Sequence, residues 1–304
     1  MIIKKEKKGN IDIYYVDKDI TDEKMIEYKN TIVKPAQIKD VINFDADVYT
    51  KEGKLLLKFR KNKLPSEHVD EFYDNVIKFA TRPTSNRGSS SGSKKLNIYE
   101  NPKIMTNIIG YFDIFSASQK VLIRNANKKL LEVRETQFIM DYPDKYKKLI
   151  PLIKDIDAFY EKYVPDKYAK QKKKAKQTPF KIANTAFTTI TTNVNFQTYI
   201  HKDAGDDMEG FGNLVVIEKG NYDGGETCFP QYGIGVDVRT KDVLFMDVHE
   251  WHGNLPIKLE DKEAKRLSVV CYLRQSVWQK TKHKTKKFMI AHNKTIKNLR
   301  KPKT

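Results

Sequence analysis

The feature that most restricts the fold lies beyond Pro179, where apolar segments of strand length follow one another with short polar connections. Gly, Asn and Asp residues lie between the segments. Short connections join antiparallel strands, and a run of short strands of this kind is typical of a barrel or a jelly roll. The predicted strands occupy residues 188–201, 213–217, 226–229, 234–238, 242–246 and 266–273. We therefore predict a compact antiparallel β core.

One of these segments carries residues that can bind a metal ion. If residues 194–203 form a strand, alternate side chains share one face. The polar face then carries Asn195, Gln197, Tyr199, His201 and Asp203. An imidazole and a carboxylate two residues apart can bind one divalent ion from the same side. A later histidine would complete a 2-His-1-carboxylate triad, which leaves positions on non-haem Fe(II) open for a cosubstrate and oxygen.

Two later histidines compete for the third ligand position. His249 and His252 are three residues apart, so in a strand they would face opposite sides and only one would reach the metal. His252 precedes Gly253 and Asn254, which suits the entrance of a strand beside a crowded site. We predict His252 as the ligand, with His249 as the alternative ligand or as a core or supporting residue.

Arg266 begins another apolar strand and needs a partner there. A buried guanidinium is costly unless a negative charge compensates it. A dicarboxylate cosubstrate would supply that charge, bound by both arms of Arg266 and by the hydroxyl of Ser268 on the same face. The alternative is a structural salt bridge to an acid such as Asp242.

The remaining sequence predicts flanking α and β elements, so the expected fold class is α+β. Residues 47–59 read as a hairpin that turns at Gly53, and helices are predicted from Ser66, through residues 105–112 and over residues 142–163. We predict an N-terminal α+β extension at 1–95, a double-stranded β-helix domain with support helices at 96–278, and a basic tail at 279–304. The tail is predicted as a phosphate-binding or partly disordered end.

The charge balance indicates a polyanionic partner. Lys and Arg outnumber Asp and Glu by 57 to 39, a formal net charge of +18. Clustered cations favour nucleic acid, and the alternative is a merely lysine-biased composition. The candidate contacts lie in the acid-free run 167–176 and in the loop 84–93, which reads equally well as a linker. They are Lys172, Lys173, Lys174, Asn86 and Arg87.

The compartment also follows from the sequence. The first residues are charged where a signal peptide needs an apolar run, and no segment is apolar enough to span a membrane. Cys228 and Cys271 are the only cysteines, too few for a disulfide framework or a zinc module. We expect an intracellular protein that is not secreted.

Four motifs resemble those of the Fe(II)/2-oxoglutarate dioxygenase superfamily. They are His201-x-Asp203, Gly224-Gly-Glu-Thr-x-Phe-Pro230, His252-Gly253 and Arg266-x-Ser268. The stretches 220–233, 242–254 and 266–272 are more particularly similar to the TET/JBP branch, whose members oxidise the methyl group of 5-methylpyrimidines in nucleic acids. The likeness covers residues 185–275 well and residues 40–95 weakly.

The resemblance implies a cofactor set and a role for each site residue. Fe(II) would be held by His201, Asp203 and His252. The cosubstrate 2-oxoglutarate would bind Arg266 and Ser268, with Tyr199 and Asn195 also in its site, and O2 would be the second cosubstrate. Thymine and 5-methylcytosine in DNA are equally open as substrates, and the oligomeric state is open too.

Two other functions compete with this interpretation. A prolyl or lysyl hydroxylase would use the same iron chemistry, but prolyl 4-hydroxylases generally carry Lys where this chain has Arg266. A non-catalytic nucleic-acid-binding module predicts a broken triad, and this sequence keeps all three ligand candidates.

Overall fold

A computed structural model describes residues 1–80 and 105–300 of the chain. The fold is mixed α+β, as predicted. It divides into two compact units that interleave along the sequence: unit 1 holds residues 1–107, 192–204 and 211–270, and unit 2 holds 108–191, 205–210 and 271–304. The predicted consecutive division at 95/96 and 278/279 stays a prediction. No helix in the described part of the chain has both the length and the apolar composition that a membrane crossing requires.

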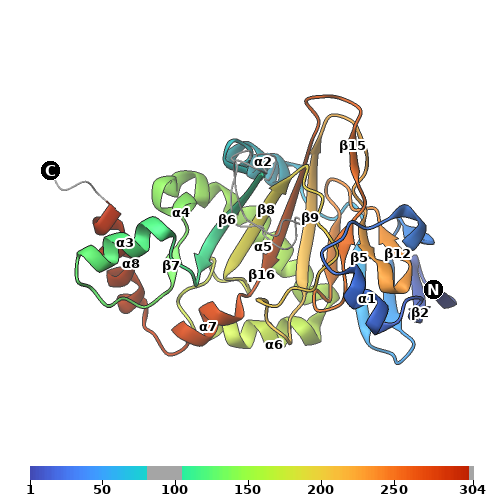
Figure 1. Ribbon diagram of the computed structural model, residues 1–304, viewed down its shortest axis with the longest axis horizontal. Helices are drawn as coiled ribbons and strands as arrows, with labels where there is room; N and C mark the ends of the chain where they lie inside the picture. Colours follow the sequence, from blue (N-terminus) through green and yellow to red (C-terminus); the bar gives the residue numbers. More distant parts are fainter. Residues whose placement is uncertain (81–104, 301–304) are drawn as a thin grey trace. The chain divides into compact units, whose positions relative to one another are not determined.

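Unit 1 contains a large sheet, and in Figure 1 its strands β9 and β16 lie side by side. The strand order is β1(Ile2–Lys8), β2(Ile11–Val16), β4(Ala46–Thr50), β5(Leu55–Arg60), β13(Val243–Met246), β9(Gly212–Lys219), β16(Lys265–Tyr272) and β8(Thr189–Val194). The strands β6, β8 and β16 contribute residues to both units. The N-terminal strands β4 and β5 therefore extend the same sheet that carries β13 and β9.

A small sheet and a two-stranded ribbon complete the β structure of unit 1. The small sheet has the order β14(Gly253–Asn254), β11(Thr227–Phe229), β12(Ile234–Val236) and β3(Asp40–Ile42), and β10(Tyr222–Gly224) pairs with β15(Ile257–Leu259). Val48, Leu57 and Leu244 of the large sheet share one buried apolar cluster with Phe229 and Val236 of the small sheet. The two sheets thus enclose a common core, which is the packing of a jelly roll. The helical elements are α1(Asp22–Tyr28), η1(Pro35–Gln37), α2(Ser66–Ala80) and η3(Pro230–Tyr232).

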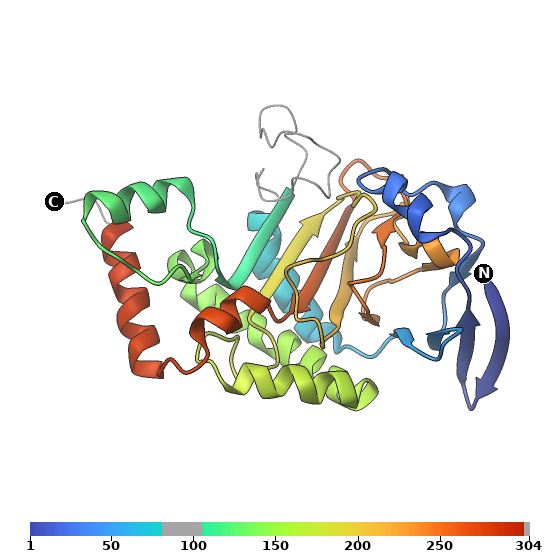
Figure 2. The same ribbon diagram turned by 60° about the horizontal axis from the view of Figure 1, so that its bottom comes forward.

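Unit 2 is largely helical, and Figure 2 shows α8 beside α3. Its elements are α3(Ala117–Asn125), β7(Arg134–Glu135), α4(Gln137–Asp141), α5(Pro143–Tyr163), α6(Pro165–Lys176), α7(Gln275–Thr281) and α8(Lys286–Arg300), and β6(Met105–Phe112) pairs with β7. The buried carboxylate of Asp157 on α5 accepts hydrogen bonds from the Ala186 amide at 2.7 Å and the Tyr168 hydroxyl at 3.1 Å. This carboxylate ties α5 to α6 and to the chain that leads into β8.

Several sequence predictions are confirmed. The hairpin of β4 and β5 has Gly53 in its turn with φ +80°, and α2 and α5 lie where periodicity predicted helices. Strands β9, β11, β12, β13 and β16 match the predicted segments to within a few residues.

Two predictions of local structure are wrong. The strand predicted through Asp203 ends at Val194, because Asn195 has a φ of +49° that no strand residue adopts. The helix predicted at 105–112 is the strand β6, whose Gly110 has a φ of +107°. Within the predicted tail, α8 buries His292 and Ile296, four residues apart, and the phosphate-binding role of the tail stays a prediction.

Candidate metal and cosubstrate site

The backbone brings two of the predicted metal ligands together across an isolated β-bridge. The amide of His201 donates to the His252 carbonyl at 2.9 Å, and the amide of His252 donates to the His201 carbonyl at 2.9 Å. The Asp203 amide donates to the Val248 carbonyl, also at 2.9 Å. Two chain segments that are far apart in sequence are therefore fixed against each other at the site.

The three ligand side chains converge within unit 1. His201 Nε2 lies 3.4 Å from Asp203 Oδ1, and His252 Nε2 lies 3.7 Å from Asp203 Oδ2. The ligand atoms of all three residues lie within 4.8 Å of one another. One ion can contact all three atoms, because metal–ligand bonds of about 2 Å separate neighbouring ligand atoms by about 3 Å.

Backbone hydrogen bonds set the tautomer of both imidazoles. His201 Nδ1 lies 2.8 Å from the Tyr199 carbonyl oxygen, and His252 Nδ1 lies 2.9 Å from the Glu250 carbonyl oxygen. A carbonyl oxygen only accepts, so each Nδ1 carries the proton and each Nε2 presents a lone pair toward Asp203. Burial lowers the pKa of His252 to about 4, and the neighbouring His201 imidazole adds to this effect. The donor set thus fits a divalent metal ion, which binds the neutral imidazole.

His249 lies outside this cluster and supports it. Its Nδ1 is 3.0 Å from the Asp203 carbonyl oxygen, and its amide donates to Asp247 Oδ1 at 3.1 Å. Of the two histidines that competed for the third position, the structure brings His252 to the other two ligands.

Arg266 is buried at the start of β16 with no carboxylate in an ion pair with it among the described residues. Burial lowers the pKa of Arg266, and the nearby Tyr222 and Glu218 oppose that effect. The alternative partner Asp242 instead accepts from the backbone amides of Asn62 at 2.8 Å and Arg239 at 3.0 Å. The alternative structural salt bridge between Arg266 and Asp242 is not formed, and binding of a cosubstrate carboxylate by Arg266 stays a prediction.

A polar side chain of β8, that of Asn193, contacts the neighbouring strand β16. Asn193 Nδ2 donates to Ser268 Oγ at 3.3 Å, while Asn193 Oδ1 is buried and finds no partner in the described part of the chain. Sequence reasoning missed Asn193, although its place two residues before Asn195 and the antiparallel pairing of β8 with β16 could have indicated it. An unsatisfied polar atom beside the hydroxyl of Ser268, on the strand that also carries Arg266, fits a polar cosubstrate.

The side chain of Asn195 forms hydrogen bonds with the backbone at the start of β16. Its Oδ1 accepts from the Arg266 amide at 2.7 Å, and its Nδ2 donates to the Ala264 carbonyl at 2.9 Å. Asn195 therefore positions the backbone of Arg266, and a contact of Asn195 with the cosubstrate stays a prediction. Tyr199 orients His201 through its carbonyl oxygen, and a contact of its phenol with the cosubstrate stays a prediction.

The predicted nucleic-acid contacts fall into three cases. Lys172 and Lys174 form ion pairs inside unit 2, with Asp157 and with Asp207 and Glu209. Lys173 is exposed on α6. Asn86 and Arg87 lie outside the described residues. The role of these five residues in binding stays a prediction.

Known proteins resemble the chain in sequence and in fold. It is 28% identical over 285 residues to the thymine dioxygenase JBP1 of Crithidia fasciculata, covering 90% of this chain and 32% of the relative. It is 32% identical over 173 residues to the bifunctional helicase and thymine dioxygenase JBP2 of Trypanosoma cruzi, covering 57% of this chain and 15% of the relative. The chain thus spans a third or less of the length of these relatives.

A solved structure supports the fold assignment. NgTET1 in complex with 5mC DNA matches 91% of this chain and 100% of its own, with a TM-score of 0.53 and 15% identity. Residues 124–275 match the family Tet_JBP, the oxygenase domain of the 2OGFeDO superfamily. The chain therefore belongs to the Tet_JBP family of 2-oxoglutarate-dependent dioxygenases.

Proposed function

We propose that this chain uses Fe(II), 2-oxoglutarate and O2 to hydroxylate the methyl group of a 5-methylpyrimidine in DNA, with thymine as the first candidate. The observation that carries the proposal is the convergence of His201, Asp203 and His252 within 4.8 Å, with both Nε2 atoms available. Relatives at 28% and 32% identity are thymine dioxygenases, which favours thymine over 5-methylcytosine.

The proposed reaction oxidises two partners with one molecule of O2. The base methyl group and 2-oxoglutarate each give up two electrons. One oxygen atom enters the carboxylate of succinate as CO2 leaves, and the other becomes the hydroxyl of the hydroxymethyl base. Bound Fe(II) supplies the oxidising chemistry.

The residues of the chain bind and orient the reactants. The two imidazoles and the carboxylate of Asp203 would hold the metal ion, a ligand set typical of non-haem Fe(II) oxygenases. Arg266 and Ser268 bind the far carboxylate of 2-oxoglutarate, the guanidinium through two parallel hydrogen bonds. Because Arg266 is buried, water competes poorly for this carboxylate.

A duplex substrate adds a requirement for phosphate contacts. The methyl group of a paired pyrimidine lies in the major groove, so the nucleotide has to leave the stack at a cost of a few kcal/mol. Helix α8 offers suitable cations, because Lys286, Lys287 and Lys294 are exposed and form no ion pair with the described residues. No acidic residue occurs between Lys280 and Arg300.

The experiment that tests the function compares three substrates. The purified protein is incubated with Fe(II), 2-oxoglutarate and either a duplex with thymine as its only methylated base, a duplex with uracil in place of thymine plus 5-methylcytosine, or proline- and lysine-containing peptides. Nucleoside mass spectrometry should find 5-hydroxymethyluracil with matching succinate in the first duplex. Product in the second duplex alone would assign 5-methylcytosine. Succinate released only with peptides would replace the proposal with the protein-hydroxylase alternative.

Gly225 should be needed for cosubstrate binding. It has a φ of +80°, and a Cβ there would lie 2.9 Å from Arg266 Nε. We expect Gly225→Ala to displace the guanidinium and raise the KM for 2-oxoglutarate about tenfold, equivalent to about 1.4 kcal/mol. Gly53→Ala is the matched control, because Gly53 also has a φ of +80° but nothing within 4 Å of the added carbon. Equal effects of the two substitutions would assign the loss to backbone strain.

The exposed lysines of α8 should contribute to DNA affinity independently of sequence. Lys287 and Lys294 lie two turns apart on one helix face. If each contacts a phosphate, Lys287→Ala with Lys294→Ala should reduce the slope of log K against log salt by about 2. Lys120→Ala with Lys147→Ala is the control, because these lysines pair with Glu132 and Asp144. An unchanged slope for the α8 double variant would exclude this face as a phosphate contact.

A further inference from the structure

The turn formed by residues 247–250 holds two of the three ligand residues. The Val248 carbonyl accepts from the Asp203 amide at 2.9 Å, and His249 Nδ1 lies 3.0 Å from the Asp203 carbonyl. The Glu250 carbonyl accepts from His252 Nδ1 at 2.9 Å. The position of this turn therefore sets where Asp203 lies and how the His252 ring is oriented.

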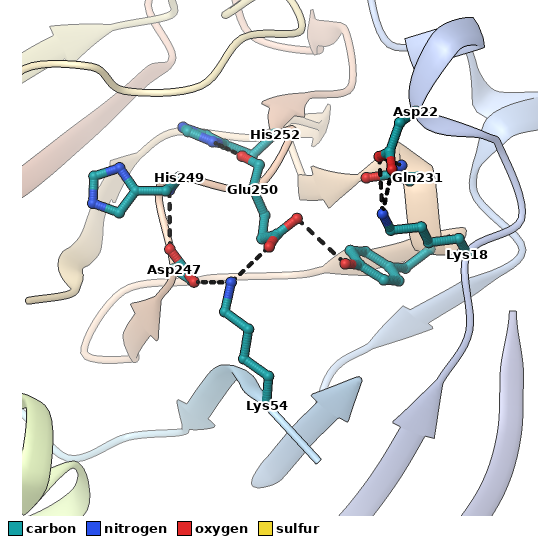
Figure 3. A network of polar contacts seen from close by, with 9 residues as sticks. Lys18, Asp22, Lys54, Gln231, Asp247, His249, Glu250 and His252 are labelled. Carbon is teal, nitrogen blue, oxygen red and sulfur yellow. Dashed lines mark hydrogen bonds and ion pairs between the residues drawn. The ribbon is translucent and has the colours of Figure 1, made fainter. Parts of the chain in front are cut away.

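One lysine from the N-terminal hairpin bridges the two ends of this turn. Lys54 Nζ lies 2.8 Å from Asp247 Oδ2 and 2.7 Å from Glu250 Oε1. Figure 3 shows the ammonium group between the two carboxylates. The side chain of Asp247 is 5% exposed and that of Glu250 is 15% exposed. The second oxygen of Glu250 accepts from the Tyr232 hydroxyl at 3.3 Å. The two carboxylates thus meet at a single ammonium group.

Electrostatics make this lysine more important than an ordinary surface pair. Two largely buried carboxylates three residues apart repel each other, and a charge between them removes the repulsion. Burial alone would lower the pKa of Lys54, but hydrogen bonds and charges from Asp247 and Glu250 raise it overall. Lys54 therefore stays protonated and keeps both carboxylates in place.

We propose that Lys54 is a positioning residue for the metal centre. It clamps the 247–250 turn so that the Val248 and Glu250 carbonyls hold Asp203 and His252 in ligating geometry. This inference rests on the proposed metal site. If it is correct, the hairpin of β4 and β5, which is far from the ligands in sequence, contributes to metal affinity through the 247–250 turn.

The test measures metal binding of the full chain, with Co(II) as a spectroscopic probe. Lys54→Met should weaken Co(II) binding on the order of 10- to 100-fold, the usual effect of removing support behind a ligand. The Co(II) absorption bands should also change in position or intensity. Lys54→Arg keeps the charge and should restore most of the affinity.

The matched control is Lys51→Met in the same hairpin. Lys51 is 60% exposed and pairs with Asp17 at 2.9 Å, away from the 247–250 turn. The Lys51→Met variant should bind Co(II) with the affinity of the parent. A merely structural role for Lys54 would lower the unfolding temperature of the metal-free protein and leave the Co(II) affinity unchanged.

The outcomes separate this inference from the function on which it rests. A parent protein that binds no metal would overturn both. A parent that binds Co(II), with unchanged affinity and spectrum in Lys54→Met, would overturn the clamp alone. If Lys54→Met does not fold, Glu250→Gln takes its place, because it keeps the volume and removes one of the two charges that Lys54 holds. Weaker Co(II) binding in that variant supports the clamp, and parental binding contradicts it.

Discussion

Asp203→Ala protein is expected to lose base oxidation by about a thousandfold, which corresponds to about 4 kcal/mol of transition-state stabilisation. Asp203 is the carboxylate that both imidazoles face, at 3.4 Å and 3.7 Å. Without it, two neutral nitrogen ligands remain for a divalent ion. Turnover measured by nucleoside mass spectrometry at saturating Fe(II) gives the effect directly.

Metal binding should fall together with activity. A ligand that binds only the folded state at a hundred times its Kd stabilises that state by about 2.7 kcal/mol. The parent should therefore melt at a higher temperature with Fe(II) or Co(II) than after chelation, and Asp203→Ala should melt at the same temperature in both conditions. An Asp203→Ala protein that keeps the metal-dependent shift and oxidises normally would refute the metal assignment.

The two histidines provide an internal comparison. His252→Ala should behave like Asp203→Ala, because it removes a nitrogen of the cluster. His249→Ala removes a contact to the Asp203 carbonyl and should cost on the order of 10- to 100-fold in metal affinity without abolishing binding. The reverse order of effects would make His249 the ligand.

Arg266→Met is expected to lose 2-oxoglutarate binding and keep its fold. Charged hydrogen bonds contribute about 1.5–3 kcal/mol each, so removing the guanidinium should raise the Kd by about a hundredfold or more. The metal-free, cosubstrate-free protein should be as stable as the parent or more so. The reason is that a buried charge without a carboxylate partner is replaced by an apolar side chain of similar length.

Arg266→Met is expected to bind 2-oxoglutarate more weakly and yet to be at least as stable as the parent, and this combination makes the prediction specific. If Arg266 had a structural role, Arg266→Met would lower the unfolding temperature and bind 2-oxoglutarate as well as the folded parent. Titration calorimetry with 2-oxoglutarate and with a 2-oxo acid that lacks the distal carboxylate separates the cases. The parent should prefer 2-oxoglutarate, and the variant should bind both acids equally weakly. Arg266→Lys keeps the charge but loses the paired hydrogen bonds, so its affinity for 2-oxoglutarate should lie between that of the parent and that of Arg266→Met.

The sequence predicted which three side chains meet but not how they meet. Residue type and spacing indicated His201, Asp203 and His252, because few side chains bind a divalent ion and these three accompany the Arg266 motif. The strand that was expected to align His201 with Asp203 ends at Val194. The alignment comes instead from the bridge between His201 and His252, a long-range contact that local periodicity does not encode.

The supporting residues were beyond sequence reasoning for a similar reason. Lys54 is one of many lysines and differs from them only because the fold brings two carboxylates to it. Asn193 lies in a strand whose residues are all buried, so alternation gave no sign of its role. The helix predicted at 105–112 failed because apolar residues at Met105, Ile108 and Phe112 also fit a strand that is largely covered on both faces.

If the three ligand candidates hold a metal ion as proposed, the bridge between His201 and His252 determines when during synthesis the site is complete. A chain still emerging from the ribosome exposes the first histidine and the aspartate well before the second histidine is synthesised. Until that later segment docks, only two of the three proposed ligands are in place. The proposed metal site is therefore complete only after the segments that carry His201 and His252 have paired.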